Sequence, residues 1–148
     1  MNKWNKLYEV AKKYYPTESN YCGVMAVALA LEVSFGAARS LLFKQDFRFD
    51  GEGSSLNGIR RTLEKEGKVV RTIYARGFIE CALKGRRVAT LEKSMRNTRG
   101  TYILLSKSHA ITVIDGVVED WTSAEYLKGR KPHTNLIGII WKIEDQTS

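Results

Sequence analysis

Residues that cross-link a chain or hold a metal are scarce in this sequence. Its 148 residues include two cysteines, two histidines and two prolines, and the cysteines and histidines are not paired at metal-ligand spacing. This composition argues against a structural zinc site. No glycine-rich phosphate loop and no dinucleotide-binding motif is present, so we expect the protein to need no metal and no cofactor.

Long apolar segments are missing as well. The longest run, Val24 to Leu31, is much shorter than the roughly 20 residues that cross a bilayer, so membrane insertion is not expected. Met1 is followed by a polar, basic stretch in place of the apolar core of a signal peptide. We therefore expect a cytoplasmic protein in which Cys22 and Cys81 are reduced.

What the chain does contain suits a globular fold. Hydrophobic residues make up 43% of it, and a chain of this length buries roughly two thirds of its unfolded surface. No repeat and no linker divides the sequence, so a single domain over residues 1–148 is expected.

The net charge of +8 is concentrated in one segment. Between Arg60 and Gly100 there are 12 Lys or Arg and 4 Asp or Glu, whereas the rest of the chain has 12 of each. Two interpretations of this basic segment stay open. It is either a solvated face that aids solubility or a docking surface for an acidic protein or for phosphates.

Apolar spacing and capping residues predict mainly helices up to Asn97. The run that follows Cys22 is apolar on every side, which is typical of a helix buried all round. The other predicted helices are one that ends before Pro16, one capped by Ser34, one capped by Ser55 with Leu56, Ile59 and Leu63 on a shared face, and one capped by Thr90.

Strand patterns dominate after Gly100. Runs of β-branched and aromatic residues, separated by turn residues, predict strands over Thr101–Leu105, His109–Ile114, Val117–Trp121 and Leu136–Ile143. A helical N-terminal half with a buried central helix, packed on a C-terminal antiparallel sheet, gives the α+β class.

One hairpin of this sheet is specified by its turn. Asp115-Gly116 is a strong signal for a two-residue type I′ turn, which fixes the register of the flanking strands. Because side chains alternate faces with period two, His109 and Asp120 are expected on one face as diagonal neighbours. Such neighbours lie about 7–8 Å apart, close enough for a carboxylate to reach an imidazole. Glu119 and Asp115 face the wrong way for this contact.

Cys22 is the candidate nucleophile. Only a thiolate attacks, and the N–H groups and dipole at a helix N-terminus favour negative charge; Asn20, as the helix cap, would place Cys22 in the first turn. His109 would take the thiol proton and Asp120 would orient the imidazole. Structural roles are the alternative. A cysteine on an apolar helix is commonly a small buried hydrophobe, and a histidine that begins a strand can be a structural residue with its hydrogen bonds satisfied.

These residues resemble the papain-like fold, in which a catalytic Cys opens the central helix, a His begins a sheet strand and an Asn or Asp lies on the next strand. A more specific resemblance, to a group of small phage and prophage proteins with papain-like cysteine peptidase character, rests on Asn20–Gly23, Gly51–Ser55, Gly100–Leu105 and His109–Trp121. The chain is also distantly similar to the peptidase domains of bacteriocin-exporting transporters. The resemblance extends from about Asn20 to Trp141 and implies Cys22 as nucleophile, His109 as general base and acid, and Asp120 as the orienting acid.

One departure from the papain-like pattern concerns the oxyanion. These peptidases usually carry a Gln several residues before the Cys, whereas Pro16, Thr17 and Glu18 occupy that region here. Asn20, together with the backbone N–H of Cys22, is the candidate substitute, and its competing role is to cap the helix. Loss of one oxyanion donor can lower the rate by about 10²–10³.

Two functions follow as expectations. The first is a cysteine hydrolase that acts on an amide, thioester or isopeptide bond of a protein or peptide, in the host cytoplasm if the protein is phage-encoded. The second is a catalytically weak or inactive papain-like protein that docks a host protein or nucleic acid through the basic segment. Nucleic acid is the less favoured partner, because the segment offers few aromatic residues, mainly Tyr74 and Phe78, to stack bases.

Overall fold

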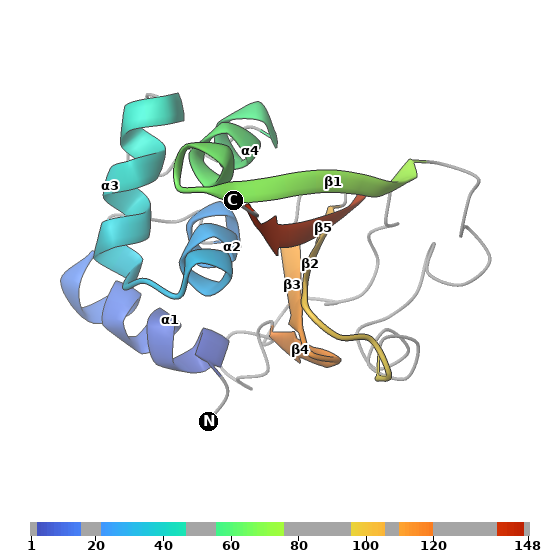
Figure 1. Ribbon diagram of the computed structural model, residues 1–148. Coiled ribbons are helices and arrows are strands. Elements are labelled where there is room, and N and C mark those ends of the chain that lie inside the picture. The colour runs from blue at the N-terminus through green and yellow to red at the C-terminus, as the bar shows by residue number, and fades with distance from the viewer. Residues whose placement is uncertain are drawn as a thin grey trace. The chain divides into compact units, whose positions relative to one another are not determined.

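The computed structural model describes residues 3–15, 22–46, 56–75, 96–105, 110–119 and 139–146. In these residues the chain forms four helices and a five-stranded antiparallel sheet (Figure 1), which confirms the α+β class. The elements are α1 (Lys3–Tyr14), α2 (Cys22–Leu31), α3 (Phe35–Asp46), α4 (Leu56–Lys65), β1 (Lys68–Ala75), β2 (Thr101–Leu105), β3 (Ala110–Ile114), β4 (Val117–Glu119) and β5 (Ile139–Asp145). The helix predicted after Thr90 lies outside the described residues.

The internal contacts of the chain divide it into two compact units. The helical unit comprises residues 1–70 and 145–148, and the sheet unit comprises residues 71–144. Both boundaries fall within strands, since β1 and β5 each run from one unit into the other.

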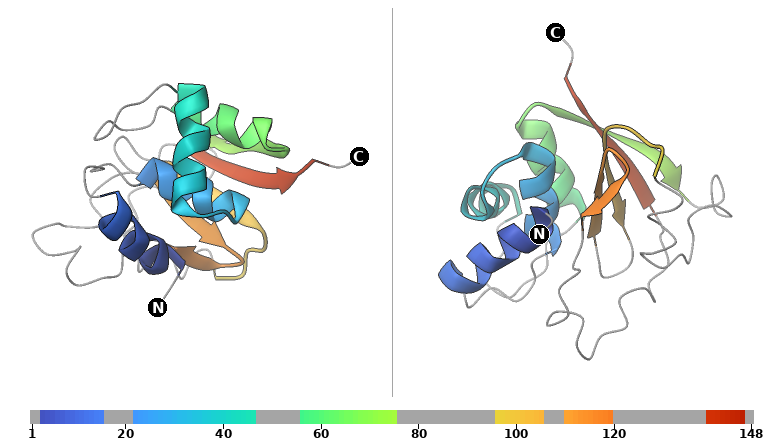
Figure 2. Two further views of the ribbon diagram at one scale, coloured as in Figure 1. Left: turned by 90° about the vertical axis from the view of Figure 1, so that its left-hand side faces the viewer. Right: turned by 90° about the horizontal axis from the view of Figure 1, so that it is seen from below.

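The helix α2 is central to the helical unit. It contacts α1, α3 and α4, which Figure 2 shows beside it. Alanine and leucine, which favour helix formation, make up half of its ten residues. Every residue from Gly23 to Ala30 is buried, so the predicted helix with no solvent-facing side is confirmed.

The ends of the neighbouring helices follow from local chemistry. Ser34 Oγ accepts a hydrogen bond of 3.1 Å from the Ala37 N–H, which confirms Ser34 as the cap of α3. Beyond α4, Gly67 adopts a φ of +89°, the left-handed conformation that commonly ends a helix.

The buried face of α4 is shorter than predicted. Ile59 and Leu63 are buried as expected, but Leu56 is 42% exposed. Leu56 is the first residue of α4, so it lies at the end of the apolar face and not within it.

The approach of α1 to α3 requires a residue without a side chain, Gly36. A Cβ atom on Gly36 would lie 2.4 Å from Tyr15 Oη. The Tyr15 ring packs against Phe35, with centroids 5.3 Å apart, and the Arg39 guanidinium lies 5.1 Å from its centre. Glycine at position 36 therefore makes room for this aromatic and cationic contact.

In the sheet, the strand order is β1-β5-β2-β3-β4. The strand β5 lies between β1 and β2, so the two central pairings join β2 to β5 and to β3, both antiparallel. Leu104 is aligned with Ile111 on one side and with Ile140 on the other. These three residues pack with Val113 and Val118 in one buried cluster, which is the core of this face of the sheet.

A buried row of residues crosses the opposite face. The register aligns Trp141 with Ile103, Ile103 with Thr112, and Thr112 with Glu119. All four side chains are at most 5% exposed. This face therefore combines apolar packing with two buried polar side chains.

In the described ranges no single helix has the length and apolar character that a membrane span requires, and α2 and α3 satisfy that requirement only jointly, as a pair bent by 109°.

Candidate functional site

Cys22 is the first residue of α2. Its side chain is partly exposed, whereas the eight residues that follow are all buried. Cys22 takes part in no disulfide. Cys22 therefore lies at the partly exposed N-terminal end of a helix whose next eight residues are buried, where the first-turn N–H groups have no acceptor within the helix.

The hairpin between β3 and β4 has the predicted turn. Asp115 and Gly116 have φ values of +47° and +81°, as a type I′ turn requires. Thr112 pairs with Glu119 and Val113 with Val118, so the predicted register is confirmed.

Asp115 has a structural role in this turn. Its N–H donates a 2.9 Å hydrogen bond to the Gly100 carbonyl, and its Oδ1 accepts a 2.8 Å bond from the Gly100 N–H. These reciprocal bonds tie the turn to the start of β2. The exclusion of Asp115 as the orienting acid stays a prediction, because His109 lies outside the described residues.

The proposed partners of Cys22 adjoin this hairpin in sequence. His109 directly precedes β3 and Asp120 directly follows β4. His109, Asp120 and the oxyanion candidate Asn20 lie outside the described residues, so their contact with Cys22 stays a prediction.

Sequence reasoning did not identify the burial of Glu119. Its side chain is only 5% exposed, although it stands at the end of a three-residue strand. The available signal was Thr112, a polar residue within an apolar strand, which the predicted turn aligns with Glu119. Burying a carboxylate costs free energy unless polar groups contact it. Glu119 does take part in an interaction within the protein.

Several cations of the basic segment are engaged within the chain. Arg60 contacts Glu64 at 3.3 Å and the Val70 carbonyl at 2.9 Å, Arg61 contacts the Gln45 carbonyl at 3.3 Å, Arg71 contacts Glu144 at 2.7 Å, and Lys68 pairs with Asp145. Of the seven Lys and Arg residues of the segment that the structure describes, Arg60, Lys68 and Arg71 thus pair with carboxylates.

No group of three His, Cys, Asp or Glu side chains suited to a metal ion occurs among the described residues. Comparison with known proteins gives no assignment: no family model, no curated protein and no solved structure matches the chain.

Proposed function

We propose that the protein is a papain-like cysteine hydrolase in which Cys22 is the nucleophile, His109 the general base and acid, and Asp120 the orienting acid. Its substrate is a protein or peptide carrying an amide, isopeptide or thioester bond, and no cofactor takes part. The observation that carries the proposal is the position of Cys22, partly exposed at the first residue of a helix whose next eight residues are all buried.

The burial pattern of α2 favours a catalytic thiol over a packing residue. A cysteine that only fills space would be expected among the buried positions of the helix, from Gly23 to Ala30. A nucleophile needs the opposite, an accessible sulfur beside the positive end of the helix dipole.

The hairpin register supports the choice of His109 and Asp120. Ile111, Val113 and Val118 share one face of β3 and β4 in the core cluster. If the two-residue alternation continues by one step along each strand, we expect His109 and Asp120 on that same face. The diagonal pairing that an orienting carboxylate needs is therefore consistent with the observed turn.

In the proposed reaction, His109 removes the Cys22 proton and the thiolate attacks the substrate carbonyl, forming a carbon–sulfur bond. The imidazolium then protonates the leaving group, which departs and leaves an acyl-enzyme. His109 next deprotonates a water molecule that attacks the thioester. The acid product leaves and the thiol is restored.

Thiol labelling tests the proposal directly. We expect iodoacetamide at neutral pH to modify Cys22 at least about tenfold faster than Cys81, because only an activated thiolate reacts quickly. His109→Ala should slow the modification of Cys22 by a similar factor, and Asp120→Asn should slow it less. His133→Ala is the matched control and should leave the rate unchanged.

The role of Asn20 needs a separate measurement. Alkylation by iodoacetamide forms no oxyanion, so Asn20→Ala should leave labelling unchanged while it lowers hydrolysis of a peptide thioester by about 10²–10³. If Asn20 is only the helix cap, both rates should change together with the stability of α2.

Equally slow labelling of Cys22 and Cys81 would contradict the hydrolase. That result would favour the alternative, a papain-like binding protein that docks its partner through the basic segment. A salt-sensitive shift on DNA or RNA would then indicate a nucleic-acid partner, and its absence a protein partner.

A further inference from the structure

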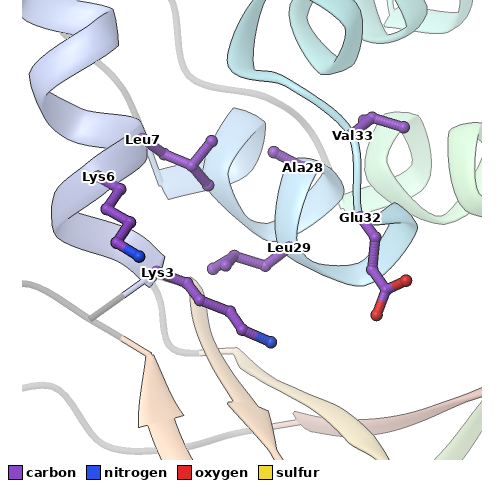
Figure 3. A pocket seen from close by; sticks show the side chains of 7 residues that line it. All are labelled: Lys3, Lys6, Leu7, Ala28, Leu29, Glu32 and Val33. Atoms are coloured by element: carbon purple, nitrogen blue, oxygen red, sulfur yellow. The ribbon is translucent and has the colours of Figure 1, made fainter. Parts of the chain in front are cut away.

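A pocket of about 340 Å³ lies between α1 and the C-terminal end of α2. Figure 3 shows its lining, which consists of Lys3, Lys6 and Leu7 from α1, Ala28 and Leu29 from α2, and Glu32 and Val33 from the turn that follows. All seven residues belong to the helical unit. The volume lies at the lower end of the range for small-molecule sites, about 300–1,000 Å³.

The pocket combines an apolar floor with charges of both signs. Leu7, Ala28, Leu29 and Val33 supply the floor. Lys6 and Glu32 lie at opposite ends, and Lys3 lies along the edge between them (Figure 3). Their charges are available to a ligand, because in the described residues neither lysine forms an ion pair with Glu32.

The negative end of the pocket is built by the way α2 terminates. Glu32 has a φ of +57°, the left-handed conformation that glycine usually occupies after a helix. The Val33 N–H donates a 3.0 Å hydrogen bond to the Ala28 carbonyl, which closes the helix and brings Val33 back to the floor. The carboxylate thus stands beside the C-terminal, negative end of the α2 dipole.

We propose that this pocket binds a short apolar peptide with two free termini, whose carboxylate contacts Lys3 and Lys6 and whose ammonium group contacts Glu32. A ligand with only an anionic group would form no ion pair with Glu32. A ligand with only a cationic group would form no ion pair with the two lysines and would be repelled by them. A zwitterion with an apolar body matches both ends and the floor between them.

This site is independent of the proposed hydrolase, since none of its residues takes part in the thiol chemistry. The test uses the full chain, labelled with ¹⁵N, and follows backbone amide shifts during titration with the dipeptide Leu-Leu. We expect saturable shifts of the amides that line the pocket.

Matched ligands separate the three parts of the site. N-acetyl-Leu-Leu lacks the ammonium group and Leu-Leu amide lacks the carboxylate; each should bind about two- to fivefold more weakly, as expected for exposed charge pairs. Gly-Gly keeps both charges without the apolar body and should bind at least about tenfold more weakly than Leu-Leu.

Matched variants assign the charges to residues. Lys3→Gln with Lys6→Gln should abolish the preference for Leu-Leu over its amide, and Glu32→Gln should abolish the preference over the acetylated peptide. Lys12→Gln with Lys13→Gln removes the same charge from the last turn of α1, outside the pocket, and should change neither preference.

Three results would overturn the proposal. The first is the absence of shifts at the pocket during titration with Leu-Leu. The second is tighter binding of octanoate than of Leu-Leu, which would indicate a simple amphipathic anion. The third is an equal loss of affinity in the control variant, which would indicate attraction by the net charge of the protein.

Discussion

The helical unit and the sheet unit bury their polar side chains in different ways. In the helical unit, Thr62 is buried, and its Oγ1 donates a 2.7 Å hydrogen bond to the Gly58 carbonyl one turn earlier in the same helix. In the sheet unit, the buried polar residues Thr112 and Glu119 are aligned on different strands. The first arrangement needs only local helix geometry, whereas the second needs the correct strand register.

The largest expected effect concerns the contribution of buried apolar side chains to the stability of the helical unit. Leu63 is fully buried in α4 and Leu56 is 42% exposed. We expect Leu63→Ala to lower the free energy of unfolding by about 2–5 kcal/mol, and Leu56→Ala to change it by less than about 0.5 kcal/mol. Urea denaturation measures both. Similar losses of unfolding free energy in the two variants would mean that Leu63 is not part of the core that stabilises this unit.

In the sheet unit the corresponding test concerns the buried carboxylate. Glu119→Ala should cost about 1–3 kcal/mol of unfolding free energy, because it removes a buried polar side chain together with the interaction that this side chain makes. Glu144, on β5, is the control, since its ion pairs with Arg71 and Lys142 are partly exposed to solvent. Glu144→Ala should cost less than about 1 kcal/mol, and that cost should fall with added salt. Equal, salt-sensitive costs would show that the burial of Glu119 contributes little.

The contact between Tyr15 and Gly36 tests packing within the helical unit at finer scale. A methyl group at position 36 must displace the Tyr15 ring, so Gly36→Ala should cost about 1–3 kcal/mol in thermal or urea unfolding. Tyr15→Phe removes the hydroxyl that lies 2.4 Å from the added atom. Gly36→Ala introduced into that variant should then cost little, and an unchanged cost would disprove the steric explanation.

The smallest effect compares two non-glycine residues with positive φ, one in each unit, which are the two found among the described residues. Glu32 and Asp115 have φ values of +57° and +47°. Glu32→Gly should raise the unfolding free energy by about 0.5–1 kcal/mol, because glycine adopts this conformation without strain. Asp115→Gly should bring no gain, since it removes the hydrogen bond from the Gly100 N–H. Equal gains would mean that this bond adds no stability.

Features set by neighbouring residues could be predicted from the sequence. The bounds of β2, the start of α2 at Cys22, the Ser34 cap and the Asp115-Gly116 turn all depend on short segments, and all are confirmed. A strand end without such a signal was placed less well: β5 extends to Asp145, two residues beyond the predicted end at Ile143, and its predicted start at Leu136 lies outside the described residues.

Features that join remote segments could not be predicted in the same way. The burial of Glu119 requires a neighbouring strand and cover over that face of the sheet. The pocket joins Lys3 and Lys6 of α1 to Glu32 in the turn after α2. For the candidate site, sequence patterns assigned the helix position of Cys22 and the register of the hairpin. Contact between the thiol, His109 and Asp120 depends on tertiary packing that no local pattern specifies.

The position of β5 between β1 and β2 has a consequence for the newly made chain. Residues 139–145 are synthesised after every other strand, yet β1 has no other neighbour among the described strands. Until they emerge from the ribosome, β1 is unpaired and β2 presents an open edge, and such edges invite association with other chains. A chain that stops short of Ile139 is therefore expected to aggregate, whatever the state of its helices.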